Sequence, residues 1–241
     1  MIFSFEKHSD NDNKYEDDTV EESLVKEFCK DNPNYDYGYF DKPPLDSIPV
    51  GSVEWCQNVY GDIVPDYYPD FLSSYFYRKI WKTSGFVDYK RFKIDGLFIK
   101  PADNYKSWDG HLFSEEDKNI NYGEVWCSEV VDFINEWRYY VVDGKVVCSA
   151  WYDGKISDAD VLAGLAKPPQ DLGKDLLNKL EKGKYCGCID MGEIELDGDL
   201  LLVLVEACHP FAVGWYQEPP DAECYCNFLI SGYKYMKNIE I

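Results

Sequence analysis

Two Asp-Gly dipeptides, each set between apolar segments, constrain the fold of this chain more than any other feature. Asp143-Gly144 lies between two valine pairs, and Asp197-Gly198 lies between residues 185–195 and 200–207. Asp-Gly supplies the positive φ angles that a two-residue type I′ turn needs, so each dipeptide predicts an antiparallel hairpin. Residues 200–205 read Leu-Leu-Leu-Val-Leu-Val. That composition is typical of a strand buried on both faces.

Apolar spacing predicts the remaining elements. A short apolar run before Pro101 predicts a strand that ends at Lys100, and residues 124–131 and 137–151 predict further strands. Side-chain spacings of one, three and four predict helices at residues 69–81, 158–166 and 170–182. Helices mixed with antiparallel hairpins indicate the α+β class rather than a doubly wound parallel sheet.

The N-terminal region differs in composition from the rest. Residues 1–50 contain 13 acidic residues and five lysines, and residues 31–46 are rich in Asn, Pro, Tyr and Asp and predict irregular structure. Residues 48–53 and 59–64 fit either short strands or loops. We therefore expect an acidic N-terminal region, residues 1–65, and one larger domain, residues 66–241.

The net charge of -21 disfavours binding to nucleic acid or to anionic membranes. No apolar run reaches membrane-spanning length, and the first residues lack the basic and apolar regions of a signal peptide. We therefore expect a cytoplasmic protein with reduced thiols. Residues 78–106 carry eight Lys and Arg but three Asp. This basic segment is either a solvated surface or a site for a small polyanion such as a nucleoside triphosphate.

Two Cys-x-Cys pairs, Cys186/Cys188 and Cys224/Cys226, stand out among the nine cysteines. Four thiolates can hold zinc, but zinc pairs usually have two to four residues between the cysteines. Small buried residues on one face of a strand are the favoured interpretation.

Two carboxylates are expected to meet in the second hairpin. Asp190 and Glu206 lie across from each other around the Asp197-Gly198 turn, one residue away from a symmetric register. Paired carboxylates in an apolar setting repel unless a cation lies between them. Mg²⁺ is commonly held by two such ligands together with substrate phosphates. The alternative is that either acid points to solvent.

Lys100 begins a second group of candidate residues, because it ends a strand and precedes a polar loop with Lys106 and Gly110. These side chains could contact phosphates, although the spacing matches neither a P-loop nor a Rossmann fingerprint. Arg138 lies in a strand among aromatic and β-branched residues. It needs a partner there, either an acid such as Glu136 or a bound phosphate.

Together these residues resemble the ATP-grasp family, and more closely a bacterial and phage branch long known as a domain of unknown function. The resemblance spans residues 48–216. It rests on Phe98–Asp103 with Lys106 and Gly110, on Glu136–Val141, on Asp190, and on Val205-Glu206. Residues 48–54 also resemble the N-terminal signature of that branch.

The resemblance implies ATP held between two α+β lobes with antiparallel sheets, preceded by a small N-terminal region. Lys100 and Lys106 would contact phosphates, and Glu129, Val130 and Val131 would receive adenine and ribose. Arg138 would contact a phosphate or the substrate, with Lys106 as a second catalytic candidate. The predicted Mg²⁺ ligands are Asp190, Glu206 and Cys208.

Cys208 departs from the family pattern, because Asn usually stands two residues after the last metal-binding Glu. A thiol is a poor Mg²⁺ ligand, since hard cations prefer oxygen. A Cys208–His209 nucleophile pair is disfavoured because adjacent strand residues point to opposite faces.

The resemblance implies an ATP- and Mg²⁺-dependent ligase that joins a carboxylate to an amine through an acyl phosphate, with a peptide or protein among the expected substrates. Two alternatives remain open. The first is an ATP-binding chaperone or partner-binding module with the same fold, whose acidic N-terminal segment would recognise a basic partner. The second is a nucleic-acid end-joining enzyme, which the net charge disfavours.

Overall fold

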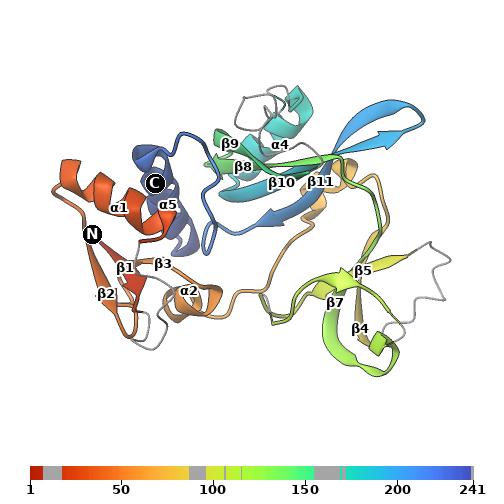
Figure 1. The fold of residues 1–241 in the computed structure, drawn as a ribbon, viewed down its shortest axis with the longest axis horizontal. Helices are drawn as coiled ribbons and strands as arrows, with labels where there is room; N and C mark the ends of the chain where they lie inside the picture. Colours follow the sequence, from red (N-terminus) through yellow and green to blue (C-terminus); the bar gives the residue numbers. More distant parts are fainter. Residues whose placement is uncertain are drawn as a thin grey trace.

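Three sheets, two of them antiparallel, form the framework of the protein in a computed structural model (Figure 1). The structure describes residues 1–7, 18–86, 96–105, 107–114, 116–154, 169 and 172–239. A parallel sheet has the strand order β2-β1-β3, and two antiparallel sheets have the orders β4-β7-β5-β6 and β11-β10-β8-β9. The expected α+β class with antiparallel sheets is confirmed.

The elements have the following bounds. The parallel sheet contains β1 (Ile2–Glu6), β2 (Asp36–Phe40) and β3 (Ile48–Val50). The second sheet contains β4 (Ile80–Phe86), β5 (Leu97–Pro101), β6 (His111–Leu112) and β7 (Asn121–Glu129). The third contains β8 (Asn135–Val142), β9 (Lys145–Gly154), β10 (Gly187–Leu196) and β11 (Asp199–Cys208). The helices are α1 (Val20–Asp31), α2 (Val53–Tyr60), η1 (Asp70–Tyr75), η3 (Glu116–Asn119), α4 (Lys174–Gly183) and α5 (Ala222–Met236).

Both predicted hairpins are confirmed. β8 pairs with β9 and β10 with β11, and the Asp-Gly residues at each turn have positive φ angles: 46° and 75° at Asp143-Gly144, 54° and 89° at Asp197-Gly198. The strand predicted to end at Lys100 is β5, one residue longer. The helix predicted at residues 170–182 begins later, at Lys174. The helix predicted at 158–166 lies outside the described residues.

Two predictions in the first 86 residues are wrong. Residues 69–81 form the short 3-10 helix η1 followed by strand β4, because Ile80 and Trp81 pair with β7. Tertiary strand pairing thus overrides a local apolar spacing that suits a helix. Residues 31–46 are not wholly irregular, since β2 pairs in parallel with β1. Residues 53–60 form helix α2, which Ser52 caps by accepting a hydrogen bond from the backbone N–H of Trp55.

Helix α5 packs between the parallel sheet and the β8 sheet. One apolar core contains Phe3 and Phe5 of β1, Phe28 of α1, Phe228 of α5 and Tyr140 of β8. Figure 1 shows α1 and α5 side by side, far from the sheet that contains β4, β5 and β7. The last helix in the sequence therefore covers the first strands. The division at residue 65 stays a prediction.

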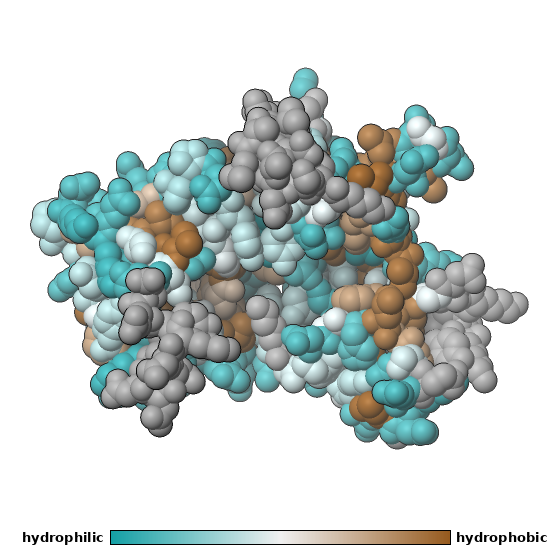
Figure 2. Space-filling model, viewed as in Figure 1, coloured by the Kyte–Doolittle hydropathy of each residue, from teal (hydrophilic) through white to brown (hydrophobic). Residues whose placement is uncertain are grey.

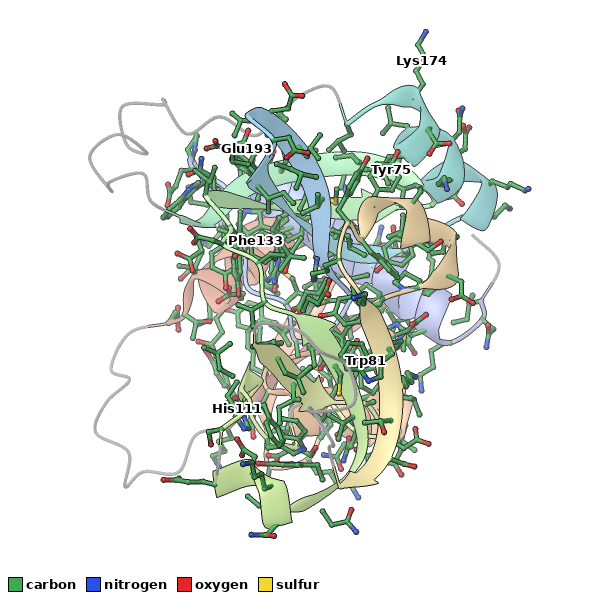
Figure 3. All side chains as sticks on the ribbon, turned by 90° about the vertical axis from the view of Figure 1, so that its right-hand side faces the viewer. Tyr75, Trp81, His111, Phe133, Lys174 and Glu193 are labelled. Carbon is green, nitrogen blue, oxygen red and sulfur yellow. The ribbon has the colours of Figure 1, made fainter. Side chains whose placement is uncertain are left out.

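The two antiparallel sheets face each other across the site. The connection from β7 to β8 links them, and Phe133 marks it between the upper and lower sheets (Figure 3). Exposed apolar side chains include Leu196 and Leu200 at the tip of the β10–β11 hairpin and Val130 in the connection. Figure 2 shows apolar residues gathered on that side of the molecule.

Candidate active site between two antiparallel sheets

Two cavities meet where the antiparallel sheets approach each other. One, of about 360 Å³, is lined by the β7–β8 connection, including Val130, Val131 and Phe133; we call it the hinge cavity. The other, of about 290 Å³, is rich in aromatic side chains; we call it the aromatic cavity. Phe98, Lys100 and Glu206 line both. A bound molecule could therefore extend from one cavity into the other past Lys100 and Glu206.

Lys100 of β5 contacts Glu206 of β11, so this ion pair connects the two sheets. Burial opposes charge on both groups. The attraction between them outweighs burial: it raises the pKa of Lys100 and lowers that of Glu206. Both side chains are thus charged at neutral pH, and their charges face the boundary between the cavities.

A β-bulge places Asp190 directly opposite Glu206. Around the turn, Leu196 pairs with Asp199 and Met191 with Leu204, but Asp190 pairs with Glu206, so Val205 is the extra residue. The bulge closes the one-residue offset that the sequence predicted. Without it, Glu206 would point to the other face of the sheet.

Arg78 holds the bulge in place. Its guanidinium donates hydrogen bonds to the carbonyls of Leu204 (2.6 Å) and Val205 (2.9 Å). It also lies over the rings of Tyr68 and Phe133 and lines the hinge cavity. The sequence analysis placed Arg78 only within the basic segment and gave it no role.

Arg138 and Asp190 form a buried, bidentate ion pair between neighbouring strands β8 and β10. Arg138 donates from Nε to Oδ1 (2.8 Å) and from Nη2 to Oδ2 (2.7 Å). Burial raises the pKa of Asp190, while the bonds from Arg138 oppose this shift. The guanidinium also lies 4.6 Å from the ring of Tyr152 and 5.2 Å from that of Tyr216. The predicted need for a partner is thus met by an acid, Asp190 rather than Glu136.

The three predicted metal ligands come together. Asp190, Glu206 and Cys208 each offer a ligand atom, and these atoms lie within 4.8 Å of one another. The thiol of Cys208 is 3.4 Å from Oε1 of Glu206, and burial raises its pKa well above the ordinary value. Two carboxylates fit the oxygen preference of Mg²⁺, and a protonated thiol does not.

Glu129, Val130 and Val131 line the hinge cavity as the sequence predicted. The carboxylate of Glu129, however, accepts hydrogen bonds from the backbone N–H (2.9 Å) and the ammonium (3.1 Å) of Lys79. Glu129 is therefore already engaged at the edge of the sheet.

Glu136 is the free carboxylate of this cavity. Among the residues that the structure describes, none donates a hydrogen bond to it. Burial, with the nearby Asp190 and Asp153, raises its pKa to about 7. The sequence analysis named Glu136 only as a candidate partner of Arg138. Its position two residues before that arginine puts both side chains on one face of β8 and could have indicated a site role.

The loop after β5 covers the aromatic cavity. Trp108, Asp109 and Gly110 line the cavity, together with Lys100 and Arg138. Lys106 lies outside the described residues. The loop returns to the sheet through His111, whose ring nitrogens bond the carbonyl of Asp109 (2.9 Å) and the carboxylate of Asp117 (3.1 Å).

The four Cys-x-Cys thiols do not form a metal group. Cys186 and Cys188 lie at the start of β10, whereas Cys224 and Cys226 lie on helix α5. Within the described ranges, Asp190, Glu206 and Cys208 are the one group of such side chains close enough to share an ion. In the same part of the chain, no helix is long and apolar enough to cross a bilayer.

Comparison with solved structures gives the same fold. The macrocyclase MdnC from Microcystis aeruginosa, bound to its precursor peptide MdnA, aligns with a TM-score of 0.52 at 11% identity, over 95% of this chain and 99% of that one. D-alanine–D-alanine ligase from Bacillus anthracis aligns with a TM-score of 0.50 at 12% identity over the whole of both chains. No curated protein sequence matches this chain.

A family profile settles the relationship. The profile of an ATP-grasp domain, the second family of one clade within that superfamily, matches residues 75–223. The match spans both antiparallel sheets and includes Lys100, Arg138, Asp190 and Glu206. The chain therefore belongs to the ATP-grasp superfamily, in this second family of its clade.

Proposed function

We propose that this protein is an ATP- and Mg²⁺-dependent ligase that joins a carboxylate to an amine through an acyl phosphate. One observation carries the proposal: Lys100, the Arg138–Asp190 pair and Glu206 converge where two cavities meet. Phosphoryl transfer depends mainly on positioning and charge neutralisation, which this group of charges can supply.

The hinge cavity fits the nucleoside. We assign adenine to the backbone of Val130 and Val131, between the apolar walls of the cavity. The ribose hydroxyls would donate to Glu136, since Glu129 is held by Lys79. The phosphates would then reach Lys100, whose ammonium is the nearest buried cation shared with the second cavity.

Asp190 and Glu206 are the proposed Mg²⁺ ligands, and the phosphates would supply further oxygen ligands. Bound Mg²⁺ would neutralise charge on the transferred phosphate. Glu206 would exchange its contact with Lys100 for this role, which frees the ammonium for a phosphate. Asp190 keeps its bonds to Arg138, so its carboxylate is fixed in position before any ligand binds.

The aromatic cavity fits the substrates that react. An oxygen of the substrate carboxylate would attack the γ-phosphorus, ADP would leave, and the amine would then displace phosphate from the acyl carbon and lose a proton. Arg138 lines this cavity and would stabilise negative charge on the acyl phosphate. A peptide is among the substrates to test, since the macrocyclase of the same fold was solved with its precursor peptide.

Calorimetric titration of Mg-ATP tests the nucleotide half of the proposal, with Lys100→Met and Asp190→Asn beside the wild type. We expect metal-dependent binding that both substitutions weaken. Hydroxylamine, which traps acyl phosphates as hydroxamates, tests the chemical half with amino acids and peptides as carboxylate donors. Equal yields of hydroxamate and ADP would support the ligase, and ADP without hydroxamate would argue against it.

A second function is a partner-binding module that binds ATP with little turnover. Cys208 favours it, because a protonated thiol occupies the third position of the metal group. This alternative predicts Mg-ATP binding without ADP release in the presence of any donor and amine. Turnover with one carboxylate and amine pair would reject it.

A further inference from the structure

Tyr67 and Tyr68 enclose the ammonium of Lys100 between them. Nζ lies 3.6 Å from the ring centroid of Tyr67 and 5.6 Å from that of Tyr68. Tyr67 lines the aromatic cavity and Tyr68 lines the hinge cavity, so one ring faces each side of the junction. Both residues precede the family match, which begins at residue 75.

The Tyr67–Tyr68 segment is fixed by its neighbours rather than by Lys100. The carbonyl of Tyr67 accepts a hydrogen bond from the backbone N–H of Ala207 (2.8 Å), next to Glu206 on β11. The ring of Tyr68 packs edge-on against Trp126, with centroids 5.1 Å apart. Both tyrosine side chains are about 95% buried. The rings would therefore stay in place if the ammonium changed partners.

Lys100 needs such a permanent partner. Its residue is only 7% exposed, and its charge is balanced by Glu206 alone among the described carboxylates in contact with it. When Glu206 turns to a divalent cation, Lys100 loses that contact and faces a like charge, which favours loss of its proton. An aromatic face attracts a desolvated ammonium without neutralising it and without competing for the metal.

We propose that Tyr67 and Tyr68 are positioning residues that keep Lys100 charged and aimed at the junction while Glu206 changes partner. Tyr67 contributes most, because its ring is nearer to Nζ by 2 Å. The inference rests on the proposed function for the step in which Glu206 leaves, but the contact itself exists without any ligand. The segment ahead of the family match would thus complete the nucleotide site.

A double-mutant cycle tests the contact in the free protein. The variants are Tyr67→Leu, Lys100→Met and the two combined, with Tyr67→Phe to retain the ring, and the readout is the urea midpoint of unfolding. We expect Tyr67→Leu to lower the midpoint less in the Lys100→Met background than in the wild type, because the cation is then absent. Tyr68→Leu should show the same coupling more weakly. Equal losses in both backgrounds would overturn the proposal.

Titration of Mg-ATP tests the positioning. Tyr67→Leu should weaken binding roughly 10- to 30-fold, and Tyr67→Phe should stay within about twofold of the wild type. Wild-type affinity in Tyr67→Leu would overturn the proposal, as would an equal loss in Tyr67→Phe, which would assign the effect to the hydroxyl group. A wild type that shows the coupling but binds no Mg-ATP would refute the proposed function and leave the cation–ring contact established.

Discussion

The two ion pairs at the centre of the molecule are built in different ways. Arg138 and Asp190 lie on adjacent strands of one sheet, and two hydrogen bonds of 2.7 and 2.8 Å join them. Lys100 and Glu206 lie on different sheets and meet through one ammonium contact. The Asp190 side chain is 1% exposed, whereas that of Glu206 is 24% exposed.

This difference separates a permanent contact from an exchangeable one. Strand pairing fixes both ends of the Arg138–Asp190 pair, and breaking it would leave a charge in the core. The Lys100–Glu206 pair borders two cavities, so water or a ligand can replace either partner. The first pair therefore organises the site, and the second is free to take part in binding.

The largest effect should come from breaking the permanent pair. Arg138→Ala leaves Asp190 charged or protonated without a partner in the core, and we expect a loss of about 3–5 kcal/mol in the free energy of unfolding. Glu206→Gln is the matched control, since Lys100 keeps Tyr67 and partial access to solvent. Urea denaturation measures both. If the loss in Glu206→Gln equals that in Arg138→Ala, the two pairs do not differ as proposed.

Removing the cation of the exchangeable pair should weaken nucleotide binding much more than it weakens the fold. Lys100→Met should reduce Mg-ATP affinity roughly 100-fold, because a charge-assisted contact to phosphate contributes about 1.5–3 kcal/mol. Calorimetry measures the affinity.

Lys82→Met provides the control for this change. The Lys82 ammonium lies over the ring of Trp126, 4.4 Å from its centroid, and the residue lines neither cavity. Its loss should leave Mg-ATP affinity near that of the wild type. Similar losses in the two variants would indicate a general effect of charge rather than a site at Lys100.

Nucleotide binding should also depend on pH through Glu136. The pKa of this carboxyl is about 7, and ribose hydroxyls would donate to its ionised form, so binding would lower that pKa. Affinity is then fully present above pH 7 and falls as the pH drops below it, by roughly tenfold between pH 8 and 6. Glu136→Gln should remove this part of the dependence, while protonation of ATP itself remains in both proteins. Identical pH profiles would exclude Glu136 from the ribose contact.

Local signals in the sequence predicted the centre of this fold well. The Asp-Gly turns fix the pairing of β8 with β9 and of β10 with β11, and a two-residue turn leaves little freedom in register. From the second turn alone, Asp190 and Glu206 were expected to be one residue out of register. The bulge at Val205 that brings them opposite was not predictable, because it depends on Arg78, more than 120 residues away.

Contacts between distant segments were missed for the same reason. The parallel pairing of β1 with β2 and β3 leaves no turn signal, since parallel strands are joined by long connections. The spacing at 69–81 suited a helix, but Ile80 is claimed by β7. Tyr67 and Tyr68 carry no motif, and their relation to Lys100 exists only after the chain has folded.

The smallest expected effect concerns Cys208, where the chain departs from its family. Cys208→Asn replaces a protonated thiol, 3.4 Å from Glu206, with an amide oxygen that Mg²⁺ can accept as a ligand. We expect the Mg²⁺ concentration for half-maximal ATP binding to fall about two- to fivefold, equivalent to at most about 1 kcal/mol. Cys208→Ser is the control for size and polarity, and Cys188→Ser tests a buried thiol outside the metal group. An unchanged Mg²⁺ requirement in Cys208→Asn would mean that Asp190 and Glu206 complete the protein's share of the site, and that only the carboxylate of the exchangeable pair responds to the metal.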